Sequence, residues 1–238
     1  MIFRQLFDSE SSSYTYLIGD AKSGNALLID PVQSQLERDL KLLNELALTL
    51  RYVVETHIHA DHITSAAALR AATGAVIGVS ARAQSEAFDL KLTHGAALKI
   101  GPYIIEARAT PGHTHSCMSY VLSGYREQGV SRLMAFTGDT LLIRGCGRTD
   151  FQQGSAKQLY RSVNEQLFTL PEETVIYPAH DYRGHRSSTI GEERRYNPRL
   201  RVGISEADFV TIMEGLTLSK PKLIGVAVPS NMCAGAVS

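Results

Sequence analysis

The chain has 238 residues, equal numbers of basic and acidic side chains at 24 each, and no basic cluster interleaved with aromatics, which disfavours nucleic-acid and anionic membrane partners. Its N-terminus carries no basic segment followed by a long apolar run, and no apolar stretch reaches membrane-spanning length. Three widely spaced cysteines argue against a disulfide framework. We therefore expect a cytoplasmic protein, complete from Met1, that folds as one domain over residues 1–238 and acts on a small molecule.

The first part of the chain combines short strand patterns with one amphipathic helix. Segments 14–18 and 26–29 are typical of two strands joined as a hairpin by turn-forming residues. Ser34 and Glu37 match a capping box, which predicts the start of a helix of about four turns. The apolar positions that recur at helical spacing, and should lie on a sheet, are Leu36, Leu40, Leu43 and Ala47.

The rest of the chain interleaves strands and helices, although many of its strands are linked as hairpins. This pattern predicts an α/β fold with mixed sheets packed face to face and helices outside. The predicted strands are 52–56, 75–79, 97–100, 103–109, 118–122, 133–136 and 175–177, and the predicted helices are 64–72 and 155–168.

A histidine-rich loop follows the apolar segment that ends at Val54. Imidazole and carboxylate groups together suit zinc, iron or manganese, and several of them after a strand can converge on one point. The sequence therefore predicts a metal site, with a solvated polar turn as the alternative. The candidate ligands in this loop are His57, His59, Asp61 and His62.

Three later segments repeat this arrangement, in which a predicted strand ends at a turn that offers a metal ligand. The turns offer His113 after Gly112, Asp139 after Gly138, and His180 after Ala179. Loops at the ends of neighbouring strands can meet at one edge of a sheet. Each glycine also lets the backbone turn sharply just before the ligand. We therefore expect all four segments to build one site.

Together these motifs resemble the metallo-β-lactamase superfamily. The resemblance implies a four-layer αββα sandwich with metals at one edge, and it leaves hydrolase and oxidoreductase activities open. In that superfamily, His57, His59 and His113 would form one site, Asp61, His62 and His180 a second, and Asp139 would bridge them.

A narrower resemblance covers nearly the whole chain. Segments 138–154, 177–182, 197–200 and 228–232 look like the corresponding segments of the persulfide dioxygenases, also called sulfur dioxygenases. This resemblance implies a glutathione-dependent reaction in which glutathione persulfide, O2 and water give sulfite and glutathione. It also implies cytoplasmic sulfide detoxification as the setting and is compatible with a homodimer.

The same resemblance implies one Fe(2+) per chain, held by His57, His113 and Asp139 as the catalytic residues. Two histidines and one carboxylate on one face of iron leave neighbouring positions open for a sulfur donor and dioxygen. The remaining four candidates would orient water and the metal ligands through hydrogen bonds. Those four residues are His59, Asp61, His62 and His180.

Glutathione carries two carboxylates, which planar guanidinium groups bind through paired hydrogen bonds. The positions that match the family's glutathione contacts are Arg148, Tyr182, Arg199 and, more weakly, Asn231. For either arginine the alternative is a surface ion pair. Cys146 lies between Arg144 and Arg148, and we expect it to line the substrate pocket rather than to act as a nucleophile.

Two other functions stay open at this point. One is a hydrolase resembling hydroxyacylglutathione hydrolase, in which all seven candidate ligands hold two metals and a bridging hydroxide attacks a thioester. The other is a non-catalytic scaffold stabilised by a metal, which would be expected to close its coordination shell. Metal stoichiometry and dioxygen uptake distinguish these functions, whereas glutathione binding does not.

Overall fold

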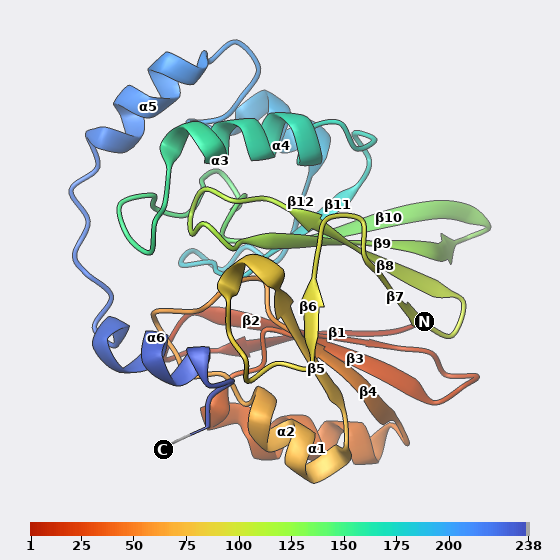
Figure 1. Cartoon of the computed structure of the whole chain (residues 1–238). Coiled ribbons are helices and arrows are strands. Elements are labelled where there is room, and N and C mark those ends of the chain that lie inside the picture. Colours follow the sequence, from red (N-terminus) through yellow and green to blue (C-terminus); the bar gives the residue numbers. More distant parts are fainter. Residues whose placement is uncertain (237–238) are drawn as a thin grey trace.

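The computed structural model describes residues 1–236 and contains two mixed β-sheets packed face to face (Figure 1). In the first sheet the strand order is β1 (Ile2–Asp8), β2 (Ser13–Gly19), β3 (Asn25–Ile29), β4 (Thr49–Val54), β5 (Val76–Ser80) and β6 (Leu90–Leu92). In the second it is β12 (Ser188–Thr189), β11 (Val175–Pro178), β10 (Val130–Gly138), β9 (Met118–Glu127), β8 (Tyr103–Ala109) and β7 (Ala97–Ile100).

Helices cover the outer face of each sheet, so the molecule has four layers (Figure 1). The first sheet is covered by α1 (Leu36–Glu45), α2 (Ala66–Thr73) and α6 (Ile224–Met232). The second is covered by α3 (Ala156–Ser162), α4 (Ile190–Tyr196) and α5 (Glu206–Glu214). This confirms the predicted αββα sandwich with mixed sheets.

The alternation of side chains along β2 shows why two separate apolar layers form. Tyr16 and Ile18 face the core between the sheets, whereas Leu17 faces the core beneath the helices. Successive residues of a strand point to opposite faces, so a strand buried on both sides needs apolar residues throughout. Tyr16 also lies 5.0 Å from Phe136 between ring centroids, which joins the two sheets.

Most predicted elements have the expected type, and the strands at 97–100 and 103–109 have the predicted bounds. The capping box was wrong: the Ser34 hydroxyl faces Asp8 instead, and α1 begins at Leu36 after a 3-10 turn. The helix predicted over 155–168 begins after its N-cap Ser155 and continues as a π-helix from Val163. Among the strands and α-helices of residues 1–236, six had not been predicted, namely β1, β6, β12, α4, α5 and α6.

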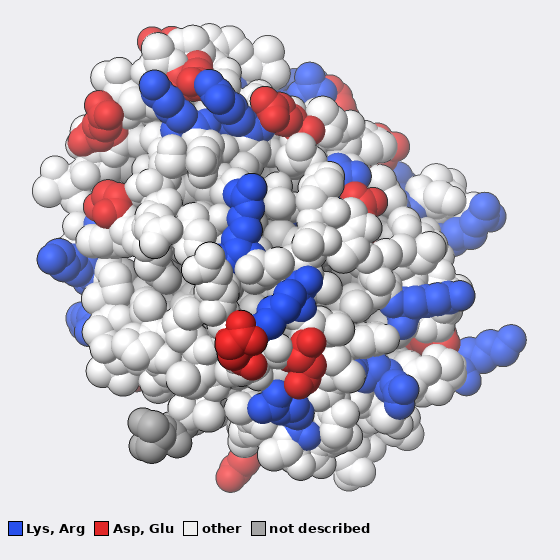
Figure 2. All heavy atoms as spheres, in the orientation of Figure 1, with Lys and Arg blue, Asp and Glu red and all other residues white. Residues whose placement is uncertain are grey.

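The lengths of the helices and the distribution of surface charge bear on membrane and nucleic-acid partners. Among residues 1–236, every helix is too short or too polar to cross a bilayer. Figure 2 shows acidic and basic side chains intermingled on the face in view, rather than a field of one sign. The prediction of one domain over 1–238 includes two residues outside the described range and stays a prediction.

Candidate metal centre

Four chain segments meet at one edge of the two sheets, as the repeated strand endings had predicted. His57 follows β4 of the first sheet, while His113, Asp139 and His180 follow β8, β10 and β11 of the second. The glycine before Asp139 has φ +53°, and a Cβ there would lie 2.8 Å from the Cβ of Thr56. The sharp turn and the close approach to the histidine loop therefore both require glycine.

The structure brings His57, His113 and Asp139 together, with one ligand atom of each within 4.8 Å of the others. Burial and the neighbouring imidazoles of His59 and His113 lower the pKa of His57 well below its usual range, so this ring is neutral. A neutral imidazole has the free lone pair that a metal ion needs.

A buried chain of hydrogen bonds fixes which nitrogen of His57 faces the centre. The Thr56 hydroxyl donates to Asp30 Oδ2 at 2.7 Å, so at 3.0 Å it accepts from His57 Nδ1. The lone pair is thereby left on Nε2. Neither Asp30 nor Thr56 had been singled out in the sequence, although Asp30 follows a predicted strand just as the metal ligands do.

His113 is oriented in a similar way by a backbone oxygen. Its Nδ1 lies 2.7 Å from the Arg148 carbonyl oxygen, which can only accept, so Nδ1 carries the proton. Its Nε2 then lies 3.5 Å from Asp139 Oδ2. The other oxygen of Asp139, Oδ1, is buried without a hydrogen-bond partner in the described chain. Two imidazole lone pairs and an unpartnered carboxylate oxygen fit a divalent metal ion.

The ring of His59 lies 4.1 Å from that of His57 between centroids, and one of its nitrogens faces two buried carboxylates. Its Nε2 lies 3.2 Å from Asp30 Oδ1 and 3.4 Å from Glu55 Oε2. Burial lowers the pKa of His59, but these two carboxylates outweigh burial and raise it well above its usual range. His59 therefore carries a proton on the nitrogen that faces Asp30 and Glu55. Glu55 is a further residue that the sequence reasoning missed.

Asp61, His62 and His180 form the other side of the site. His180 Nε2 lies 3.6 Å from Asp61 Oδ2 and 3.7 Å from Asp139 Oδ1. His62 Nδ1 lies 3.0 Å from Asp61 Oδ2. The Ser13 hydroxyl contacts all three residues at 3.2 to 3.4 Å. A second group with ligand atoms within 4.8 Å of one another consists of His59, Asp61 and His180.

A cavity of about 600 Å³ opens beside His113, Asp139 and His180. Four of the five predicted substrate contacts line it, namely Cys146, Arg148, Tyr182 and Arg199. The ring of Tyr182 lies parallel to that of His180 at 6.0 Å. Residues 218, 219 and 221, in the segment between α5 and α6, form a further part of the wall and had not been predicted.

The two candidate arginines differ in how many hydrogen bonds their guanidinium groups already make within the protein. Arg148 donates to both oxygens of Asp150 at 2.7 and 2.8 Å and to the Ser219 carbonyl at 2.6 Å. Its guanidinium therefore forms the ion pair considered as the alternative, and it also binds the cavity wall. Within residues 1–236, the guanidinium of Arg199 donates only to Cys146, to its carbonyl oxygen at 3.3 Å and to its sulfur at 3.9 Å, so it is the freer of the two.

Asn231, the weakest substrate candidate, lies outside this cavity. Its side chain is buried in α6 and hydrogen-bonds to the histidine loop. The protein itself occupies this amide, so the structure places Asn231 against the loop rather than in the cavity wall, and its contact with substrate stays a prediction. Cys146 is buried at the cavity, and this burial raises the pKa of its thiol to about 11. The thiol is thus protonated at neutral pH, as expected for a lining residue.

The chain is similar to known proteins over most of its length. The sequence profile of the metallo-beta-lactamase superfamily matches residues 9–180. Over 235 residues, the chain is 48% identical to the mouse protein named persulfide dioxygenase ETHE1, mitochondrial, and 49% identical to the human protein of that name. Each alignment covers 99% of this chain and 89% of the relative.

A solved structure is similar over the full length. The crystal structure of ETHE1 from Myxococcus xanthus superposes with a TM-score of 0.92 at 50% sequence identity. The superposition covers 99% of this chain and 100% of the other. The similarity thus includes the C-terminal segment beyond residue 180, which lies outside the superfamily profile.

Proposed function

Because this chain belongs to the persulfide dioxygenase family of the metallo-beta-lactamase superfamily, we propose that it oxidises glutathione persulfide with O2 and water to sulfite and glutathione. The observation that carries the proposal is the grouping of His57, His113 and Asp139 beside the cavity, in a chain similar to these relatives over 99% of its length. The fold alone does not decide the reaction, since the superfamily includes hydrolases.

The three grouped residues would hold one ferrous ion. An iron ion held by these three ligands would supply the redox chemistry that joins a sulfur donor to dioxygen. Thr56 and the Arg148 carbonyl keep both imidazoles in the tautomer that presents Nε2. With Asp139 as the one carboxylate among these ligands, a divalent ion would keep one positive charge, which would attract a persulfide anion.

The surroundings of His59 favour one metal over two. A dinuclear site of the hydrolase type would use His59 as a neutral ligand beside His57 and His113. The carboxylates of Asp30 and Glu55 raise the pKa of His59 well above its usual range, and the doubly protonated ring that they favour has no lone pair for a metal ion. His62 Nδ1 likewise lies 3.0 Å from Asp61 Oδ2. This carboxylate oxygen, which a second metal ion would need as a ligand, is therefore already engaged by His62.

The cavity has the chemistry to hold glutathione. A volume of about 600 Å³ is within the usual range for small-molecule sites. Arg199 has donors left for a carboxylate, and Tyr182 and Cys146 line the space near the metal ligands. Arg148 already donates to Asp150 and to the carbonyl oxygens of Leu218 and Ser219, so it has fewer donors left for substrate than Arg199.

Anaerobic purification followed by metal analysis and an oxygen electrode tests the proposal. We expect one iron per chain and dioxygen uptake when glutathione persulfide is added. Two metal ions per chain with thioester cleavage and no dioxygen uptake would overturn it in favour of the hydroxyacylglutathione hydrolase type. The cytoplasmic setting and the homodimer stay proposals, testable by cell fractionation and by sedimentation.

A further inference from the structure

The C-terminal helix reaches the histidine loop through one buried side chain. We propose that Asn231 is a positioning residue that fixes the loop 57–64 in its metal-binding shape. The inference rests on the proposed function only in requiring that this loop holds a metal ion. It assigns to α6 a role at the site although the superfamily profile ends at residue 180.

The amide of Asn231 is complementary to the loop in all three of its contacts. Its Nδ2 donates to the carbonyl oxygens of His59 at 2.9 Å and His62 at 2.8 Å. Its Oδ1 accepts from the backbone N–H of Thr64 at 2.9 Å. Both donors of the amide are therefore used, and Asn231 is 2% exposed. No other amino acid of this size offers two donors and an acceptor.

These contacts matter because backbone pairing of the loop is sparse and lies at its end, where the Gln33 N–H donates to the Ile63 carbonyl and Thr64 forms a bridge with Val32. The segment from Glu55 to Ile63 is neither helix nor strand. His59 and His62 are buried, so their carbonyl oxygens have no bulk water as an alternative partner. One side chain thus joins two carbonyl groups three residues apart, and it fixes the chain direction between His57 and the following helix α2.

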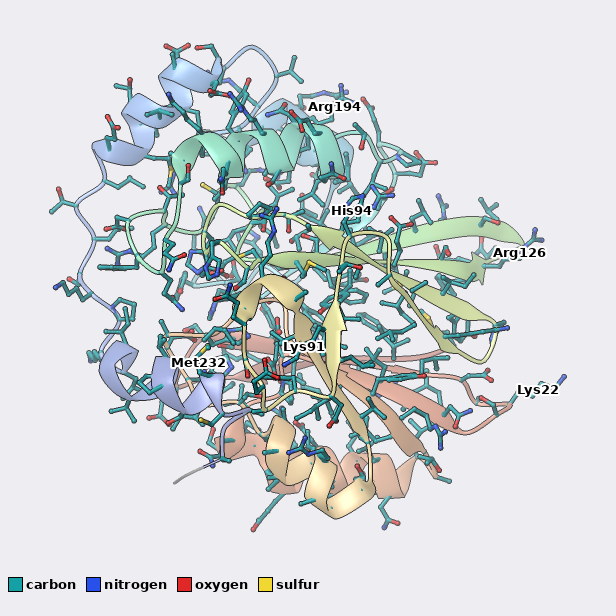
Figure 3. All side chains as sticks on the ribbon, in the orientation of Figure 1. Lys22, Lys91, His94, Arg126, Arg194 and Met232 are labelled. Atoms are coloured by element: carbon teal, nitrogen blue, oxygen red, sulfur yellow. The ribbon has the colours of Figure 1, made fainter. Side chains whose placement is uncertain are left out.

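Close docking of the C-terminus keeps Asn231 in place. The Ala67 N–H donates to the Ala234 carbonyl at 2.9 Å, and Ala234 is fully buried. A Cβ on Gly235 would lie 1.9 Å from the Thr64 carbonyl oxygen, so the tail packs directly on the end of the loop. On the same helix, labelled at Met232 in Figure 3, the Met232 carbonyl accepts from the Ser85 hydroxyl at 2.6 Å.

Two variants separate the loop contact from general docking of α6. Asn231→Leu keeps the size and removes all three hydrogen bonds. Ser85→Ala removes a hydrogen bond between α6 and the body of the protein without touching the loop. The measurements are the Kd of the metal-free chain for Co(II) or Fe(II), by competition with a chelator, and amide hydrogen exchange of residues 57–64.

For Asn231→Leu we expect a Kd about 10- to 100-fold higher, as for other residues that orient metal ligands, and faster exchange in the loop. For Ser85→Ala we expect the metal Kd and the amide exchange of residues 57–64 to match those of the parent. Unchanged metal affinity in Asn231→Leu, or an equal loss in Ser85→Ala, would overturn the proposal. Neither measurement uses persulfide. A negative result would therefore count against the role of Asn231 and not against the proposed dioxygenase activity.

The parent protein provides a test that does not depend on a variant that folds. If Asn231 couples α6 to the loop, metal binding must slow amide exchange in residues 224–232 as well as in 57–64, because coupling is reciprocal. Slower exchange in the loop alone would contradict the proposal.

Discussion

The carbonyl oxygen of Arg148 accepts a hydrogen bond from Nδ1 of His113 at 2.7 Å, while the guanidinium of the same residue binds Asp150 and the Ser219 carbonyl. One arginine therefore orients a candidate metal ligand through its backbone and holds the cavity wall through its side chain. Changes at the cavity wall are thus connected to the metal centre by a single residue.

Replacing His113 should abolish dioxygen uptake and leave the fold intact. His113→Ala removes one of three metal ligands at the surface of the cavity, so metal content should fall well below one ion per chain. His94→Ala, at the exposed residue labelled in Figure 3, serves as the control and should retain metal. Loss of folded structure in His113→Ala, together with an inactive parent, would instead favour a metal-stabilised scaffold.

Gly147 should tolerate no side chain, because two residues of the centre approach it closely. A Cβ there would lie 2.6 Å from the Asp139 carbonyl oxygen and 2.8 Å from His113 Nδ1. Gly147→Ala should therefore displace both ligands and lower metal content and turnover together. The matched change Gly145→Ala has its nearest neighbour at 3.9 Å and should behave as the parent. Equal behaviour of the two variants would show that the predicted crowding is absent.

Arg199 should contribute to substrate binding more than to turnover. Arg199→Met removes the less engaged guanidinium of the cavity and should raise KM for glutathione persulfide by about 10-fold, the loss expected for one charge-assisted hydrogen bond. Metal content and kcat should stay near those of the parent. Arg201, which donates to the Pro198 carbonyl outside the cavity lining, provides the control variant Arg201→Met. A fall in kcat at unchanged KM would contradict this role.

Cys146 should resist alkylation in the folded protein. Burial raises the pKa of Cys146 to about 11 and that of Cys117 to about 12, so few of these thiols are ionised at pH 7.5. Iodoacetamide should label the exposed Cys233 first, as peptide mass spectrometry can show. Cys146→Ala should retain most of the activity, whereas complete loss would indicate a covalent role for the thiol.

Asp39 should make the protein less stable as the pH rises from 4 to 7. Burial raises its pKa from 3.8 to about 6, although Arg38 opposes the shift. The folded state then binds the proton more tightly than the unfolded state, so the free energy of unfolding falls as the pH rises from 4. The decrease is complete above pH 6. This decrease in the free energy of unfolding is at most about 3 kcal/mol.

Asp39→Asn should remove this dependence, which urea unfolding at pH 4.5, 5.5 and 7 can measure. The control Glu37→Gln changes an exposed acid on the same helix and should preserve the parent's pH profile. If the free energy of unfolding of Asp39→Asn changed with pH as it does in the parent, the Asp39 carboxyl would have an ordinary pKa in the folded protein.

Much of the site could be predicted because its residues follow strand patterns that are local in the sequence. Alternating or continuous apolar runs identified β4, β8, β10 and β11, and the ligand follows each run within a few residues. The α6 helix was not predicted, since Pro229 and Gly225 are poor helix residues and tertiary packing overrides that preference. The capping box failed for a related reason, because Asp8 of a distant strand competes for Ser34.

The local sequence was enough to predict that imidazoles and carboxylates gather at one edge of a sandwich, because these groups lie within a few residues of strand ends. Which of these groups face one another became clear from the packing of the layers. His59 lies between Asp30 and Glu55, Arg148 binds the wall, and Asn231 binds the loop from 172 residues away along the chain. Hydrogen-bond partners at such separations depend on how the layers pack, and no local pattern of residues encodes them.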